Sequence, residues 1–146
     1  MAGKTVRKYG LLAERKGRAR DAPSEDLMQI PFNMAAPRMK LADGEQVIQS
    51  HPGLRRKGIF GNRYGELHVT NQRVAFVKAV MKGIVAAAAS KLGVKPMLEF
   101  ERSAITSAEK VPVKKQFALV ITAGAQSEKI IMAPEAIDGI LAAIKP

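Results

Sequence analysis

The stretch GELHVTNQRVAFVK, residues 65–78, decides the fold that the sequence predicts. Leu67 and Val69 alternate with polar residues, and the same alternation resumes after the polar letters TNQR. A period of two, a short polar break and a second period of two are typical of antiparallel strands joined by a tight turn. We therefore expect a β-hairpin with Leu67, Val69, Val74 and Phe76 facing the core.

The turn of this hairpin is predicted to serve the fold. Asn71 tolerates a left-handed backbone and Thr70 can hydrogen-bond nearby amides, so both residues suit a tight turn. Arg73 is expected to pin the turn through backbone carbonyls or a carboxylate. We interpret the TNQR motif as structural.

Further strands are predicted on both sides of the hairpin. Leu98 and Phe100 alternate with glutamates, which places both on one strand face. The segment 53–65, GLRRKGIFGNRYG, holds four glycines and four basic residues and is predicted to be a loop. The other predicted strands cover Gln46–His51, the segment 96–102, the less regular 104–111, and a hairpin of 117–123 with 128–133.

The C-terminal segment changes from strand to helix periodicity. Pro134 suits a first helical position, and an apolar stripe at helical spacing follows it, made of Ile137, Ile140, Leu141 and Ile144. Antiparallel strands followed by one amphipathic helix predict a mainly β, α+β fold. We expect a strongly bent antiparallel sheet or partly open barrel, capped by the C-terminal helix.

Composition narrows the chemistry that the chain can carry. The 146 residues, 47% of them apolar, suit one globular domain. Because there is no cysteine, a disulfide framework and a thiolate nucleophile are excluded, and a reducing compartment fits. His51 and His68 show no metal-ligand spacing and have no nucleophile beside them in the sequence. We therefore expect no enzyme activity, no metal and no cofactor, and a cytoplasmic location that includes the periphery of a membrane.

Positive charge is concentrated at the N-terminus. The net charge is +11, and residues 1–20 hold seven basic residues against one acidic residue. Pro31 and Pro37 break the apolar stretch that follows and favour an extended conformation. We divide the chain into a basic, extended N-terminal arm (1–40) and a folded domain (41–146). The basic residues of the arm are Lys4, Arg7, Lys8, Arg15, Lys16, Arg18 and Arg20.

Two motifs resemble a known family. GELHVTNQRVAF, residues 65–76, is similar to the G-x-L-x-[LV]-T-[ND]-x-R-[LV]-x-F core of GRAM domains and related bacterial pleckstrin-homology-like domains. LADGEQVI, residues 41–48, is similar to the L-x-x-GE-x-[VI] opening of that family, and the resemblance covers about residues 41–145. It implies a bent seven-stranded antiparallel sheet plugged by a C-terminal helix. It also implies a non-catalytic module that binds membrane lipids or protein partners.

The predicted loop 53–65 is the first candidate binding site. Basic side chains bind phosphates, while neighbouring apolar side chains can enter a lipid headgroup layer. The resemblance implies a phosphate-binding role, because the corresponding loop holds the phosphate in pleckstrin-homology domains that bind phosphoinositides. The alternative is an ordinary solvated loop on a basic protein. The candidate anion- and lipid-binding residues are Arg55, Arg56, Lys57 and Arg63.

The stretch AVMKGIVAAAASKLG, residues 79–93, is the second candidate. It is too short to span a bilayer, which needs about 20 apolar residues. Alanine favours a helix, so the stretch is predicted to be a short helix or hairpin extension that enters a bilayer or packs on another copy. The alternative is packing on its own sheet. The residues assigned to insertion or self-association are Val80, Met81, Ile84 and Val85.

Two functions follow from these features. The first is a non-enzymatic module that docks on anionic membrane surfaces through the basic loop and the arm. The alternative is a component of a nucleoprotein or other large assembly, in which the arm binds phosphate backbone and the domain is a protein-contact platform. A third interpretation of the arm is a solvated tail without a partner.

Overall fold

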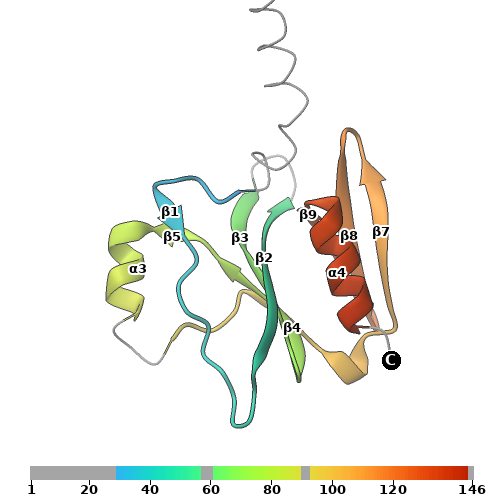
Figure 1. The fold of residues 1–146 in the computed structure, drawn as a ribbon, viewed down its shortest axis with the longest axis horizontal. Helices are drawn as coiled ribbons and strands as arrows, with labels where there is room; N and C mark the ends of the chain where they lie inside the picture. Colours follow the sequence, from blue (N-terminus) through green and yellow to red (C-terminus); the bar gives the residue numbers. More distant parts are fainter. Residues whose placement is uncertain (1–28, 57–60, 90–92, 145–146) are drawn as a thin grey trace, which may run out of the picture.

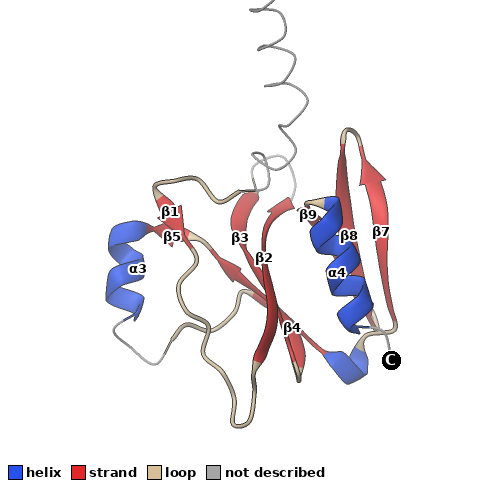
Figure 2. Cartoon of the chain, in the orientation of Figure 1, coloured by secondary structure: helices blue, strands red, loops and turns tan. Residues whose placement is uncertain are grey.

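The computed structural model describes residues 29–56, 61–89 and 93–144 of the chain (Figures 1 and 2). In these described ranges strands dominate, with two short α-helices and one 3-10 helix among them. The elements are β1 (Met34–Ala35), β2 (Val47–Arg56), β3 (Asn62–Thr70), β4 (Arg73–Lys78), β5 (Val80–Met81), α3 (Lys82–Ala89), β6 (Leu98–Glu101), η1 (Arg102–Ala104), β7 (Ser107–Val113), β8 (Gln116–Ala123), β9 (Gln126–Met132) and α4 (Pro134–Ile144).

Seven of these strands form one antiparallel sheet in the order β6-β4-β3-β2-β9-β8-β7. Its two edges, β6 and β7, are consecutive in the chain and are joined by η1, and the sheet does not close. The predicted fold class is confirmed: the chain is mainly β, with a bent, unclosed antiparallel sheet and one C-terminal helix. The basic arm as far as Met28 lies outside the described residues.

The predicted hairpin is β3–β4, in the expected register. Leu67 lies opposite Phe76, and Val69 lies opposite Val74. All four side chains are at most 1% exposed, which confirms that they face the core. The strand with Leu98 and Phe100 on one buried face and the β8–β9 hairpin are confirmed as well.

Helix α4 covers the inner face of the sheet beside β7 and β8 (Figure 1). Ile137 and Ile140 are fully buried in the main core, and Leu141 and Ile144 pack against that core while half-buried. The predicted apolar stripe is therefore confirmed. Burying a large aliphatic side chain contributes about 1.5–3 kcal/mol, so this stripe holds the short helix in place.

A second layer covers the outer face of β4. Met39 is buried against Ala75 and Val77, and β1 pairs with β5 beside it. After a turn at Phe32 and Asn33, closed by the Met34 amide on the Pro31 carbonyl at 2.8 Å, residues 34–40 run without helix along the domain. The proposed domain boundary at Leu41 stays a prediction. Met39, which precedes this boundary, is buried against Ala75 and Val77 of the folded domain.

The prediction of a loop over residues 53–65 was wrong for most of that segment. Strand β2 continues to Arg56 and β3 begins at Asn62, and only the positions between Arg56 and Gly61 lie outside the described residues. Two of the glycines that suggested a loop, Gly53 and Gly65, lie opposite each other in the β2–β3 ladder. A side chain at Gly65 would collide with Phe76, so this glycine permits close packing within a strand.

A buried polar network joins the turn before β2 to the β3–β4 turn. The Glu45 carboxylate accepts hydrogen bonds from Arg73 Nε at 2.8 Å, Thr70 Oγ1 at 2.8 Å and the Ala42 amide at 2.9 Å. Arg73 Nη2 adds a second bond to Glu45 at 3.0 Å, and Nη1 pairs with Glu99. Burial opposes ionisation of Glu45, but the bonds from Arg73, Ala42 and Thr70 outweigh it and lower the pKa of this carboxyl.

The remaining turn residues complete this network. Asn71 Oδ1 accepts from the Gln46 amide at 2.8 Å, and Asn71 Nδ2 donates to the Gly44 carbonyl at 3.0 Å. Thr70 Oγ1 also accepts from the Arg73 amide at 2.9 Å, which closes the turn. The TNQR turn is therefore bonded to the ADGE turn of residues 42–45, and its contacts agree with the structural role that we assigned to it.

Replacing Arg73 should leave the Glu45 charge buried without its main partner. We expect Arg73→Met to lower the free energy of unfolding by about 3 kcal/mol, the cost typical of breaking a buried ion pair by removing one side. Urea unfolding followed by circular dichroism measures this loss. Glu101→Gln, at an exposed position on β6, is the matched control and should change stability by less than about 0.5 kcal/mol. An equal effect of both changes would contradict the role of the network.

Two glycine-to-alanine changes should have opposite effects. A Cβ at Gly65 would meet the Val77 carbonyl and lie 2.6 Å from the Phe76 ring, whereas a Cβ at Gly83 in α3 meets nothing within 4 Å. We expect Gly65→Ala to destabilise the fold by about 2 kcal/mol or more, because the strands must separate. Gly83→Ala should be neutral or stabilising by up to about 1 kcal/mol, because alanine favours helix. Thermal melts of both variants test this contrast.

Candidate functional site

The start of β3 pairs with the end of β4, just before the chain enters β5. Gly65 is paired with Lys78, and the Ala79 amide donates to the Tyr64 carbonyl at 2.8 Å. The start of β3, in the first candidate segment, therefore adjoins Ala79, where the second candidate segment begins. Figure 1 shows β1, β5 and α3 at one end of the molecule, with the upper end of β3 nearer to them than the upper end of β2.

Large apolar side chains are exposed on the small β1–β5 extension. Met34 pairs with Met81, and the Lys82 amide donates to the Asn33 carbonyl at 3.2 Å. Phe32, which precedes Asn33, therefore lies near the start of α3. Phe32 is 89% exposed, Met81 59% and Ile84 58%. We call these three residues, Phe32, Met81 and Ile84, the apolar tip.

Exposed basic residues lie on the elements that lead to the apolar tip and at one end of the β2–β3 hairpin. Lys78 ends β4 and Lys82 begins α3, on either side of β5, while Arg56 ends β2 and Arg63 is the second residue of β3. We call Arg56, Arg63, Lys78 and Lys82 the basic rim. Two of the four were predicted as anion-binding residues. The two lysines were missed because Lys78 belongs to the hairpin stretch 65–78, which we interpreted as structural, and Lys82 falls in the segment assigned to insertion.

Other predicted site residues take different positions. Arg55 forms a two-point ion pair with Glu128, at 3.1 and 2.8 Å, and its side chain is only 11% exposed. Its guanidinium is therefore occupied within the sheet. Lys57 and the seven basic residues of the arm lie outside the described residues.

The apolar stretch forms the predicted short helix, α3. Its contacts are with β1 and β5, and Val80 and Val85 are half-buried while Met81 and Ile84 are exposed. Of the four residues predicted for insertion or self-association, two are therefore partly packed within the protein and two are exposed. None of the helices in the described ranges has both the length and the apolar character needed to cross a bilayer.

One histidine has a close polar partner that the sequence did not reveal. Ser50 lies opposite His68 in the β2–β3 ladder, and Ser50 Oγ is 2.7 Å from His68 Nδ1. The other ring nitrogen, Nε2, is buried without a hydrogen-bond partner. Burial lowers the pKa of His68, and the charge of nearby Glu66 only partly offsets this effect. The ring is therefore held neutral. Across the described ranges, no three potential metal ligands come together.

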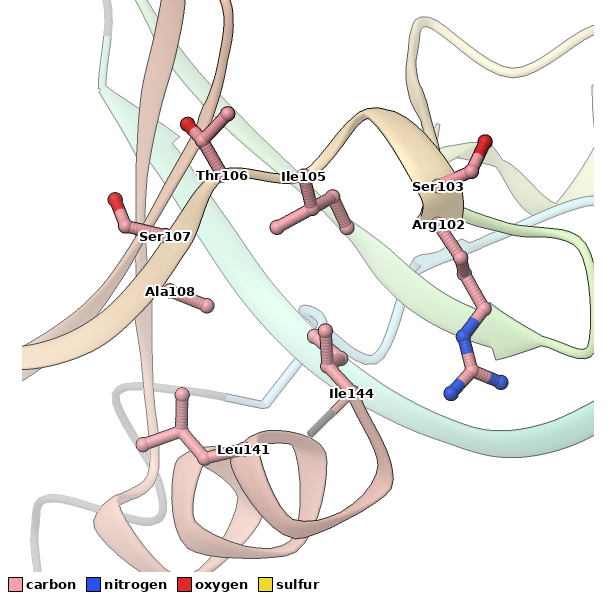
Figure 3. A pocket seen from close by; sticks show the side chains of 8 residues that line it. All are labelled: Arg102, Ser103, Ile105, Thr106, Ser107, Ala108, Leu141 and Ile144. Carbon is pink, nitrogen blue, oxygen red and sulfur yellow. The ribbon is translucent and has the colours of Figure 1, made fainter. Parts of the chain in front are cut away.

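A cavity of about 600 Å³ lies where η1, the start of β7 and helix α4 meet (Figure 3). Its apolar lining comes from Ile105, Ala108, Leu141 and Ile144, whose side chains surround the opening in Figure 3. Arg102 lines one end and donates to the Thr70 and Ala143 carbonyls at 3.3 and 2.6 Å. The sequence predicted the apolar stripe of α4. It did not predict the cavity, because the part of the stripe that the sheet leaves uncovered depends on the position of β7.

The comparisons with known proteins assign no family. No protein family and no curated protein matches the chain. Among solved structures, the chain is similar to the C-terminal domain of an unknown protein from Leishmania infantum. The two share 17% identity over 70% of this chain and 83% of that one, with a TM-score of 0.47.

His68 should make the fold sensitive to mild acid. Its folded-state pKa lies below its ordinary value of 6.5, so the unfolded chain takes up the proton first as the pH falls. Stability should therefore be full above pH 6.5 and should decrease as the pH falls toward the folded-state pKa. Urea midpoints at about pH 7.5 and about pH 5.5 measure this loss. His68→Gln should flatten the pH dependence in this window, and an unchanged dependence would show that another group causes it.

Proposed function

We propose that this chain is a non-enzymatic module of the GRAM or pleckstrin-homology-like type that docks on an anionic membrane surface at the cytoplasmic face. The apolar tip would enter the headgroup region, and the basic rim would bind lipid phosphates and carboxylates. The observations that support the proposal are the exposed apolar side chains of Phe32, Met81 and Ile84 and the exposed basic residues Lys78 and Lys82, which flank β5 in the chain.

Energetics favour a membrane over water for this combination. Exposed large apolar residues that gather in one place usually mark an interaction surface. Apolar residues that sink into the headgroup boundary gain hydrophobic energy, and basic residues beside them gain attraction to anionic lipids. Each basic residue near such a surface contributes about 1 kcal/mol, so four of them support weak, salt-dependent binding.

Charge argues against a second copy of the chain as the partner at this tip. A twofold contact places the same patch of each copy against itself. Such a contact would bring the four cations of the basic rim, Arg56, Arg63, Lys78 and Lys82, toward four more. Like charges across an interface cost free energy, whereas an anionic surface neutralises them.

Vesicle co-sedimentation tests the proposal. The full-length chain should sediment with phosphatidylcholine vesicles that contain phosphatidylserine and not with pure phosphatidylcholine, and added salt should weaken the binding. Arg56→Glu combined with Arg63→Glu should reduce the binding constant about thirtyfold or more, because each lost basic contact costs about 1 kcal/mol. Met81→Ser combined with Ile84→Ser should reduce binding without removing its salt dependence.

The controls separate this surface from general positive charge. Lys40→Glu combined with Lys115→Glu removes the same charge from exposed positions outside the apolar tip and basic rim, and should retain most of the binding. An equal loss in this variant would mean that net charge alone drives binding. Release from vesicles by excess RNA, or binding that persists after charge reversal of the basic rim, would contradict the membrane proposal. Dimerisation through the apolar tip would contradict it as well.

A further inference from the structure

The cavity beside α4 lies where the seven-stranded sheet stays open. Strands β6 and β7 are the two edges of this sheet, and the chain that joins them supplies the lining residues from Arg102 to Ala108. The last turn of α4 supplies the rest, Leu141 and Ile144. Only the first two residues of β7 line the cavity, so the space is a compact chamber and not a groove along the strand.

The interior of this chamber is apolar. Ile105, Ala108, Leu141 and Ile144 are half-buried, and Figure 3 shows their side chains converging on one space. The exposed hydroxyl groups of Ser103 and Ser107 are directed away from that space. A volume of about 600 Å³ lies within the range of small-ligand sites, roughly 300–1,000 Å³, which are mostly apolar with a few polar groups.

The one charged residue that lines the cavity is a cation. Arg102 donates to the carbonyls of Thr70 and Ala143, which are neutral groups, and it belongs to none of the ion pairs formed within the described ranges. An arginine carries five N–H donors, so donors remain for a ligand. The C-terminal end of a helix such as α4 carries only about half a negative charge, so a net positive charge remains beside the cavity.

Neighbouring carboxylates are turned away from the cavity or are paired. Glu101 lies on the outer face of β6, because Leu98 and Phe100 occupy the inner one. Glu109 follows Ala108, whose partner Ile121 is buried on the inner side, so Glu109 points to the outer side. Asp138 of α4 is bonded to Lys110 at 2.8 Å. An anion beside Arg102 would therefore meet little repulsion from these three acids.

We propose that this cavity binds a medium-chain fatty carboxylate, with the hydrocarbon chain among Ile105, Leu141 and Ile144 and the carboxylate beside Arg102. Removing the chain from water supplies hydrophobic energy, and hydrogen bonds between a guanidinium and a carboxylate are strengthened by charge. The site is built from η1, β7 and α4, so it is separate from the apolar tip and the basic rim. It gives the chain a binding function that does not depend on membrane docking.

Isothermal titration calorimetry on the full-length chain tests this proposal. The probe is decanoate, used without vesicles and below the concentration at which it forms micelles. Decanol and decylammonium have the same chain length and carry a neutral and a cationic head. Decanoate should bind more tightly than either of them. The absence of decanoate binding, or binding of decanol that is equal or tighter, would overturn the proposal.

Filling the cavity should remove the binding. Ala108→Phe places a ring in the apolar space and should weaken decanoate binding at least about tenfold, equivalent to ~1.4 kcal/mol. Ala125→Phe, in the exposed β8–β9 turn, is the matched control and should bind normally. Thermal melts confirm that both variants are folded, and both should still sediment with phosphatidylserine vesicles. Decanoate held by the basic arm would survive Ala108→Phe, and that result would contradict the assignment to the cavity.

A comparison of two ligands separates the charge of Arg102 from its structural contacts. Arg102→Gln should weaken decanoate binding at least about tenfold and leave decanol binding within about twofold, because only the carboxylate needs the cation. Arg102→Lys should retain most of the preference for decanoate. Lys115→Gln, which removes one charge from the exposed β7–β8 turn, should leave both affinities unchanged. Equal losses of decanoate and decanol binding in Arg102→Gln would show that Arg102 only maintains the fold, and would overturn its role in binding.

Discussion

The buried contact between Glu45 and Arg73 is the interaction on which the rest of the structure depends. It joins the turn before β2 to the turn between β3 and β4, and Thr70 completes it from within the second turn. A buried carboxylate is tolerated only when charged and neutral donors satisfy it, and here they come from three separate positions in the chain. The contact thereby ties together the two turns at this end of β2, β3 and β4.

The same region positions the elements at the sheet edges. Arg102 donates to the Thr70 carbonyl and to the Ala143 carbonyl near the end of α4, so η1 and the helix are tied to the hairpin turn. η1 joins β6 and β7, the two edges of the sheet, which stays open beside the helix. The apolar tip lies toward the opposite end of the molecule (Figure 1). Polar contacts that maintain the fold are thus separated from the exposed residues that we assign to binding.

Residue patterns predicted the elements whose side chains follow a regular period. The alternation around Leu67 and Phe76, and the stripe from Ile137 to Ile144, identified a hairpin and a helix correctly because each pattern lies within a few neighbouring residues. The segment 53–65 was assigned wrongly because glycines in a sequence usually indicate a loop. A glycine also occurs within a strand where a close neighbour leaves no room for a side chain. That neighbour of Gly65 is the ring of Phe76, which only the paired strands bring near.

The sequence by itself determined the mainly β class, the capping helix, the basic charge and the composition of both candidate segments. Tertiary structure alone decided how they combine. It placed Tyr64 of β3 beside Ala79, removed Arg55 from the exposed set through Glu128, which is 73 positions away, and left a cavity between β7 and α4. The physical reason is the separation along the chain between the residues that interact. Periodicity reports on which face of its own element a side chain lies, whereas partners and exposure depend on segments that meet only after the chain has folded.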